Sequence, residues 1–97
     1  YDDITQSDNK QIVNSLKTLA IKNHGLYNSI NEIKIKNDNI FLIINNTTVK
    51  INRDSIKDNV LKLLTFNKEI EEHNSIDSYI YIDLTIPNQI IVKDKII

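Results

Sequence analysis

The sequence predicts an α+β domain of two layers, in which an antiparallel sheet of about five strands carries two helices on one face. Two segments place apolar residues at the three- and four-residue spacing of a helix, and five shorter segments alternate or are rich in β-branched residues. Their order along the chain is α-β-β-β-α-β-β, which is typical of a sheet with helices on one side. At 97 residues the chain is expected to form a single domain, 1-97, around one core.

Composition excludes several classes of protein. Hydrophobic residues make up 40% of the chain, which is enough to bury a core. The 12 basic and 13 acidic residues nearly cancel, so no strong field favours nucleic acid. The absence of cysteine excludes disulfide miniproteins and cysteine-type zinc modules, and a single glycine excludes a glycine-rich phosphate loop.

The first helical segment is predicted over residues 9–24. Asp8 stands where a capping residue is wanted, His24 falls in the last turn, and Gly25 is placed to end the helix in a left-handed conformation. The apolar residues that recur on one face are Ile12, Val13, Leu16, Leu19 and Ala20.

Three strands are predicted next, joined by two tight turns. Residues 30–36 alternate isoleucine with polar residues, and residues 40–44 form an apolar run that suits a central strand. Residues 47–51 alternate again. The asparagine-rich turns at 37–39 and 45–46 tolerate left-handed backbone, so the three strands are expected to form a meander.

A second helix is predicted to follow Asp54, which can cap it. Its apolar positions recur at spacings of four and three: Ile56, Val60, Leu63 and Leu64. Phe66 and Ile70 can continue the same pattern. Residues 67–75 are polar and charged, which predicts a frayed last turn and a loop.

Two strands close the chain. From residue 79 the alternation predicts that Ile80, Ile82, Leu84 and Ile86 face the core, together with Leu16, Val60 and Leu64. The opposite, open face then receives Tyr79, Tyr81, Asp83 and Thr85. Pro87 and Asn88 predict a turn, and residues 89–95 a final strand.

Candidate catalytic groups are few. His24 is expected to interact with the helix dipole, and His73 lies in a solvated polar segment. Asp83 is an acid within an apolar strand, and its simplest interpretation is a residue on the open sheet face. His73 could form a metal site with Glu69, Glu72 and Asp77, although a solvated face is the simpler interpretation. A small hydrolase built around Asp83, His73 and neighbouring acids stays an alternative, but no enzyme activity, metal or cofactor is expected.

The final strand is the strongest candidate for a binding site. A chain-terminal strand of a small sheet is often an edge with unpaired backbone groups. Lys93, Asp94 and Lys95 resemble the charges that protect such an edge, whereas Ile90 to Val92 are apolar. Both a protected edge and an edge that accepts a partner strand fit this pattern.

The segment 81–88, Tyr-Ile-Asp-Leu-Thr-Ile-Pro-Asn followed by a hydrophobic strand, resembles the closing segment of the FtsQ/DivIB bacterial cell-division proteins. Residues 30–33 are similar to an I-x-E-I motif of that family, and the likeness spans about residues 10 to 93. Two departures stand out. Thr85 replaces a common arginine, and the Asn45-Asn46 pair replaces a glycine-containing turn.

The resemblance implies a non-enzymatic scaffold domain of the divisome. In that family this domain is extracytoplasmic, is anchored in the cell membrane by a single-pass helix, and binds FtsB/DivIC and FtsL type partners through its last strand. Position by position, the contact maps onto Ile86, Asn88, Ile90, Ile91, Val92 and Asp94. The family's POTRA domain and membrane helix are not in this chain, and the isolated domain is expected to be a monomer.

A second class of protein fits the same pattern. A stand-alone secreted or surface α+β protein-binding module, such as an inhibitor or an adhesin fragment, would share the sheet without an upstream anchor. The gene sequence before Tyr1 would separate the two, because a membrane helix and a POTRA-sized region favour the division protein.

Overall fold

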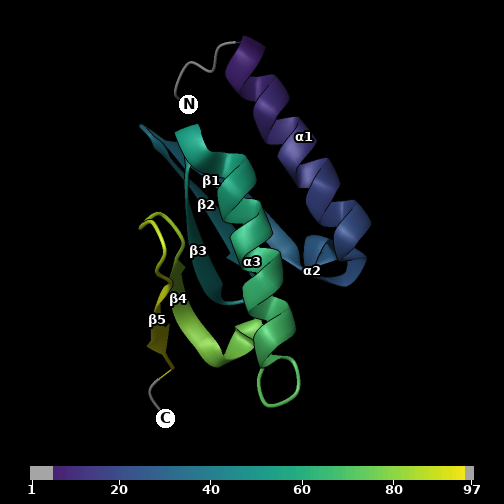
Figure 1. Cartoon of the computed structure of the whole chain (residues 1–97), viewed down its shortest axis with the longest axis vertical. Helices are drawn as coiled ribbons and strands as arrows, with labels where there is room; N and C mark the ends of the chain where they lie inside the picture. The colour runs from purple at the N-terminus through teal and green to yellow at the C-terminus, as the bar shows by residue number, and fades with distance from the viewer. Residues whose placement is uncertain (1–5, 96–97) are drawn as a thin grey trace.

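The structure, a computed structural model, describes residues 6–95, and side chains from Lys10 onward. Figure 1 shows its helices and strands, which confirm the predicted order and add a short second helix. The longer elements are α1 (Gln6–Lys22), α2 (His24–Asn28), β1 (Ile30–Lys36), β2 (Asn39–Ile44), β3 (Thr47–Asn52), α3 (Ile56–Ile70), β4 (Tyr79–Asp83) and β5 (Ile91–Asp94). Two 3₁₀ turns, η1 (Arg53–Ser55) and η2 (Ile76–Ser78), precede α3 and β4.

The fold has the two layers that the sequence predicts. The strands form one five-stranded sheet in the order β1-β2-β3-β4-β5. Helices α1 and α3 pack against each other and cover one face of this sheet, as Figure 1 shows. The opposite face carries no helix within the described residues.

The expectation of a wholly antiparallel sheet is wrong at one pair of strands. Strands β3 and β4 run parallel, with Val49 opposite Ile82. The intervening helix α3 returns the chain to the end of the sheet where β3 began, so the next strand must run in the same direction. The other three pairs of neighbouring strands are antiparallel.

Asparagine forms the turns, as predicted. Asn37, Asn45 and Asn88 have positive φ angles of 55°, 55° and 63°. Asparagine tolerates this left-handed backbone better than most residues because its short polar side chain bonds locally.

The first helix differs from its prediction at both ends. Helix α1 begins at Gln6, before Asp8, and ends at Lys22. Gly25 is not left-handed and lies inside the separate helix α2. Asn23 explains the break, because its side-chain oxygen accepts a hydrogen bond of 3.0 Å from Leu26 N–H and caps a new helix.

The prediction that Asp54 caps the second long helix is wrong, because the N-cap position of α3 is Ser55, which makes no side-chain capping bond. Asn52, not Asp54, caps the 3₁₀ turn, and its side chain accepts from Asp54 N–H at 2.8 Å. The buried Asn59 then accepts from Asn52 N–H at 2.9 Å. Helix α3 continues to Ile70, the last residue of the predicted apolar pattern, and a polar loop follows.

The core lies between the helices and the covered face of the sheet. Of the predicted core residues, Val60, Ile82 and Leu84 are buried, whereas Leu16 and Leu64 are only partly buried. The fully enclosed residues alternate along the central strands, where they are Ile40, Leu42, Ile44, Val49 and Ile51.

The predicted burial of Ile80 is wrong. Ile80 is 46% exposed, whereas Tyr79 is buried and packs on Phe66 with ring centroids 5.7 Å apart. The pairing of β4 with β5 explains why Tyr79 is buried and Ile80 is exposed. Tyr79 pairs with Asp94 and Tyr81 with Lys93, so Ile80 is an extra residue in a β-bulge. A bulge of this kind reverses which side chains face the core before it.

A buried hydroxyl group links the beginning of β4 to β3 by hydrogen bonding. Thr47 is fully buried, and its Oγ1 lies 3.1 Å from the carbonyl oxygen of Ile76 and 2.7 Å from that of Tyr79. It therefore links the first residue of β3 to η2 and to the residue next to the bulge.

Candidate functional site: an exposed edge strand

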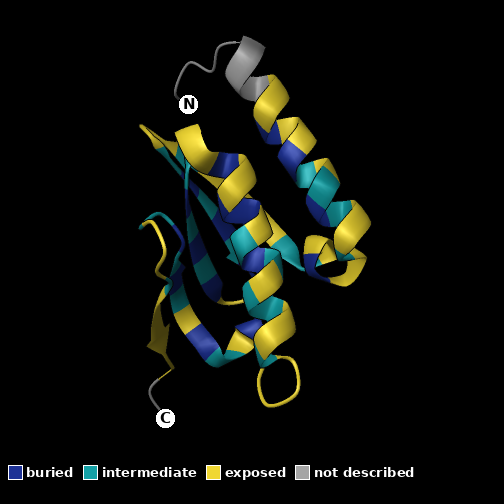
Figure 2. Ribbon diagram, viewed as in Figure 1, coloured by how far each residue is buried: buried dark blue, intermediate teal, exposed yellow. Residues whose placement is uncertain are grey.

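Strand β5 lies at one edge of the sheet. Among the described residues 6–95 it pairs only with β4, and all four of its residues are exposed. Figure 2 shows it as a continuous exposed strand beside the buried interior of the sheet. Ile91 and Val92 are 45% and 38% exposed, which leaves apolar side chains beside unpaired backbone groups.

The direction of the backbone groups on β4 follows from one hydrogen bond. Leu84 N–H donates to the carbonyl oxygen of Lys50 on β3 at 3.1 Å. Successive residues of a strand point their backbone groups to opposite sides, so Ile82 also faces β3. Tyr81 and Asp83 therefore direct theirs toward β5.

The β5 residues that pair with Tyr81 and Asp83 show which backbone groups of β5 point away from the sheet. Asp83 pairs with Ile91 and Tyr81 with Lys93, so these β5 residues bond inward. Val92 and Asp94 direct their N–H and C=O groups away from the sheet. The bond of 3.3 Å that Lys95 N–H donates back to the carbonyl of Ser78 agrees with this alternation.

A lysine on α3 holds the loop that leads to β5. Lys62 Nζ donates to the carbonyl oxygen of Leu84 at 3.3 Å and to that of Ile86 at 2.6 Å. Charged donors make the stronger protein hydrogen bonds, so this ammonium group restrains the path of the chain between the two strands.

Asp83 is the last residue of β4, and its side chain bonds to Thr85 just beyond the strand. Its Oδ1 accepts from Thr85 N–H at 2.9 Å and from Thr85 Oγ1 at 2.6 Å. Burial and the nearby Asp83 carboxylate together raise the pKa of the Tyr81 hydroxyl above its usual value. Both residues lie on the open sheet face, where the sequence places them.

The six predicted contact residues do not form one continuous strand. Ile91, Val92 and Asp94 lie in β5, whereas Asn88 lies in the turn before it. Ile86 and Ile90 are partly buried, and Ile90 packs against the core. The accessible part of the predicted set is therefore β5 and the tip of the turn.

Two features of the sheet edges could not be predicted from the sequence. The first is a cavity of about 370 Å³ beside the bulge, lined by Asn46, Ile80, Lys93, Asp94 and Lys95. Ile80 contributes to it only because the bulge turns that side chain outward. No local signal in the sequence marks the bulge.

The second feature is the opposite edge, formed by β1. A two-residue loop joins β1 to β2 and closes on the pair Lys36–Asn39. Backbone groups alternate in direction along β1 from this pair, so those of Ile33 point away from the sheet. This edge carries a bulge after Ile30 and an ion pair of 3.8 Å between Lys34 and Glu32. Bulges and charges of this kind discourage strand addition.

The candidate catalytic groups stay apart. His24 Nδ1 lies 3.2 Å from Asn28 Nδ2, and His73 is exposed in the loop after α3. Within residues 6–95, no group of three or more His, Asp or Glu residues could hold a metal ion.

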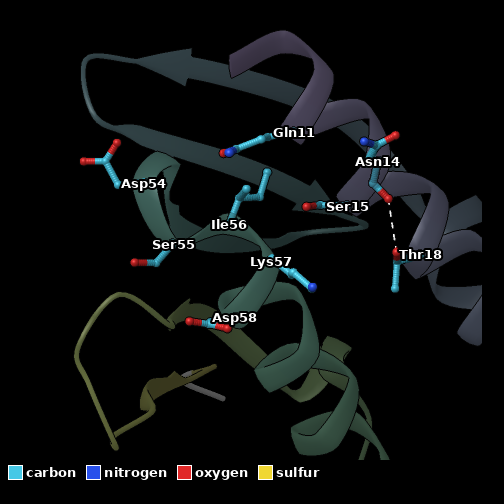
Figure 3. A pocket seen from close by; sticks show the side chains of 9 residues that line it. All are labelled: Gln11, Asn14, Ser15, Thr18, Asp54, Ser55, Ile56, Lys57 and Asp58. Atoms are coloured by element: carbon cyan, nitrogen blue, oxygen red, sulfur yellow. Dashed lines mark hydrogen bonds between the residues drawn. The ribbon is translucent and has the colours of Figure 1, made fainter. Parts of the chain in front are cut away.

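A polar groove of about 500 Å³ separates α1 from the beginning of α3. Figure 3 shows Gln11 and Ser15 of α1 directed toward Ile56, with Asp54 and Asp58 around the rim. Two acidic side chains at a helix N-terminus oppose binding of an anion there. The groove is therefore not a candidate anion site.

Comparison of the chain with protein-family models, with curated proteins and with solved structures finds no match. The geometry of the β5 edge is therefore the basis for assigning a function.

Proposed function

We propose that this domain is a non-enzymatic scaffold of bacterial cell division that binds an FtsB/DivIC or FtsL type partner by strand addition at β5. The observation that supports the proposal is the edge itself. Val92 and Asp94 direct outward backbone groups that no strand within residues 6–95 pairs with, and the side chains of their strand are exposed. An extended segment of a partner can bond to these groups as a sixth strand.

The two edges of the sheet differ in a way that supports β5 as the docking site. Ile91 and Val92 are neighbouring exposed apolar residues on β5. On β1, Ile33 stands between the charged residues Glu32 and Lys34 and next to a bulge. A partner strand gains backbone bonds at either edge, but apolar contact area is greater at β5.

The resemblance of residues 81–88 to the division proteins supplies the identity of the partner and the cellular location. In this proposal a membrane segment outside residues 1–97 anchors the protein, and this domain lies on the extracytoplasmic side. No helix within residues 6–95 is long and apolar enough to cross a membrane. The scaffold needs no cofactor, because its role is to hold partners together.

The test compares two substitutions at one position. Val92→Pro removes an outward N–H and places a ring where the partner's backbone must approach, so we expect binding to weaken at least tenfold. Val92→Ala keeps the N–H and removes only a half-exposed side chain, so we expect a loss of about threefold or less. Calorimetry with the soluble extracytoplasmic fragment of the partner measures both affinities.

A proline at the opposite edge is the matched control. Ile33→Pro removes an outward N–H of β1 and should leave partner binding unchanged, while circular dichroism confirms that each variant folds. Strand addition at β5 is refuted if Val92→Pro binds the partner as tightly as the unsubstituted domain. Equal losses from Val92→Pro and Ile33→Pro would show a general effect on the sheet instead.

A further inference from the structure

We propose that the β5 edge is selective for a partner strand that carries a long apolar side chain and a carboxylate two residues apart. The apolar side chain enters the cavity beside Ile80, and the carboxylate lies near Lys93 or Lys95. This inference rests on the proposed function, since it describes what the strand added at β5 must contain.

The bulge creates the apolar part of this site. In a regular strand, the residue before Tyr81 would face the helices. The extra residue in β4 instead leaves Ile80 46% exposed, next to the turn residue Asn46. The resulting cavity of about 370 Å³ has a mostly apolar lining and lies against β5.

Charge on this part of the edge favours an acidic partner. Two lysines, Lys93 and Lys95, line the cavity together with a single acid, Asp94. The chain as a whole carries a net charge of −1, so the local excess of positive charge is opposite in sign to the molecule's. Complementary charges at an interface favour one partner and one register over others.

The geometry of a sheet sets the spacing of the partner's side chains. Lys93 and Lys95 are two residues apart, so they lie on the same side of β5. Residues opposite them on an added strand are also two apart and point to that side. One of these positions can hold the apolar side chain and the other the carboxylate.

The length of the apolar side chain follows from the strand spacing. The added strand lies two spacings, about 10 Å, from the backbone of β4. Ile80 reaches outward from β4, and the partner's side chain must cover the remaining distance across β5. Leucine, methionine and phenylalanine are long enough, whereas alanine is not.

Short synthetic peptides test this selectivity on the whole domain. The probe is a capped peptide of alternating threonine and valine with one leucine and one glutamate two positions apart. Control peptides replace the leucine by alanine or the glutamate by lysine. Each is titrated to millimolar concentration into ¹⁵N-labelled protein, and the amide signals of Val92 and Asp94 report docking. We expect each control peptide to bind about fivefold more weakly than the probe.

Variants of the domain identify the cavity as the source of the preference. With Ile80→Ala, the leucine and alanine peptides should bind equally. Ile33→Ala is the matched control, because Ile33 is 40% exposed at the opposite edge, and it should retain the full preference.

The outcomes separate this inference from the proposed function. If the leucine and alanine peptides bind equally to the unsubstituted domain, and Val92→Pro abolishes both, strand addition stands and the selectivity is wrong. A preference for leucine that persists with Ile80→Ala also overturns it. If no peptide shifts the amides of Val92 and Asp94, both the strand addition and the selectivity are refuted.

Discussion

The hydroxyl of Thr47 gives the sharpest test of how β4 is held in place. It is fully enclosed and lies within hydrogen-bond distance of two carbonyl oxygens, those of Ile76 and Tyr79. A hydroxyl has one proton, so it donates to one of them at a time. Replacement by valine keeps the shape of the side chain and leaves both carbonyls without this donor.

The cost of Thr47→Val follows from burial. A buried polar group that loses its partner costs about 1–3 kcal/mol, so we expect the free energy of unfolding to fall by about 2 kcal/mol. With a urea dependence of ~1.5 kcal/mol per molar, the midpoint should fall by ~1.3 M. Urea denaturation followed by circular dichroism measures this shift.

Thr48 provides the matched control, because it is the next residue on β3 and faces the open side of the sheet. It is half-buried, and no hydrogen bond of its hydroxyl is seen among the described residues. Thr48→Val should change the stability by less than about 0.5 kcal/mol. If the two valine variants are equally stable, the Thr47 hydroxyl does not hold β4 to β3.

Three further predictions concern other parts of the domain. Lys62→Met removes the donor to two loop carbonyls and should lower stability by about 1 kcal/mol in urea denaturation, with faster hydrogen exchange in β5. Ile82→Ala should cost about 2–5 kcal/mol, whereas Ile80→Ala should cost less than about 1 kcal/mol, and similar losses would show that the bulge is misplaced. The pKa of Tyr81 is raised by burial and by Asp83, so the unfolded chain ionises first as the pH rises through 10.0. Stability should be fully present below that pH and fall above it, and Tyr81→Phe should reduce this fall in alkaline denaturation curves.

Local patterns in the sequence predicted most of the fold. The alternation in β3 predicted its covered face correctly, because regular strands keep a period of two, whereas the continuous apolar run of β2 predicted a central strand but not which of its side chains face the helices. The asparagines at the turns also gave correct positions, since few other residues tolerate a positive φ.

Features that depend on pairing between distant segments were not predictable. The exposure of Ile80 depends on the register of β4 against β5, which the residues of β4 alone do not contain. The parallel direction of β4 depends on where α3 returns the chain. Gly25 was misplaced because Asn23 offers the backbone an alternative cap two residues earlier.

The candidate site was predicted in part for the same reasons. The position of β5 at an edge follows from its place at the end of a small sheet. Whether Ile91 or Val92 directs its backbone groups outward could be determined only from the hydrogen bond between Leu84 and Lys50 in the structure. The cavity beside Ile80 exists because of the bulge in β4. Neither the outward-bonding residue nor this cavity could be inferred from the residues of the last strand.

The unlike edges of the sheet also limit how an assembly of this domain can grow. A strand that binds β5 becomes the new outer strand, so any further growth on that side depends on the partner's sequence and not on this domain. At the other side, the bulge after Ile30 and the charges of Glu32 and Lys34 work against the approach of a second chain. A sheet with one receptive side favours a complex of fixed stoichiometry over an open-ended fibre.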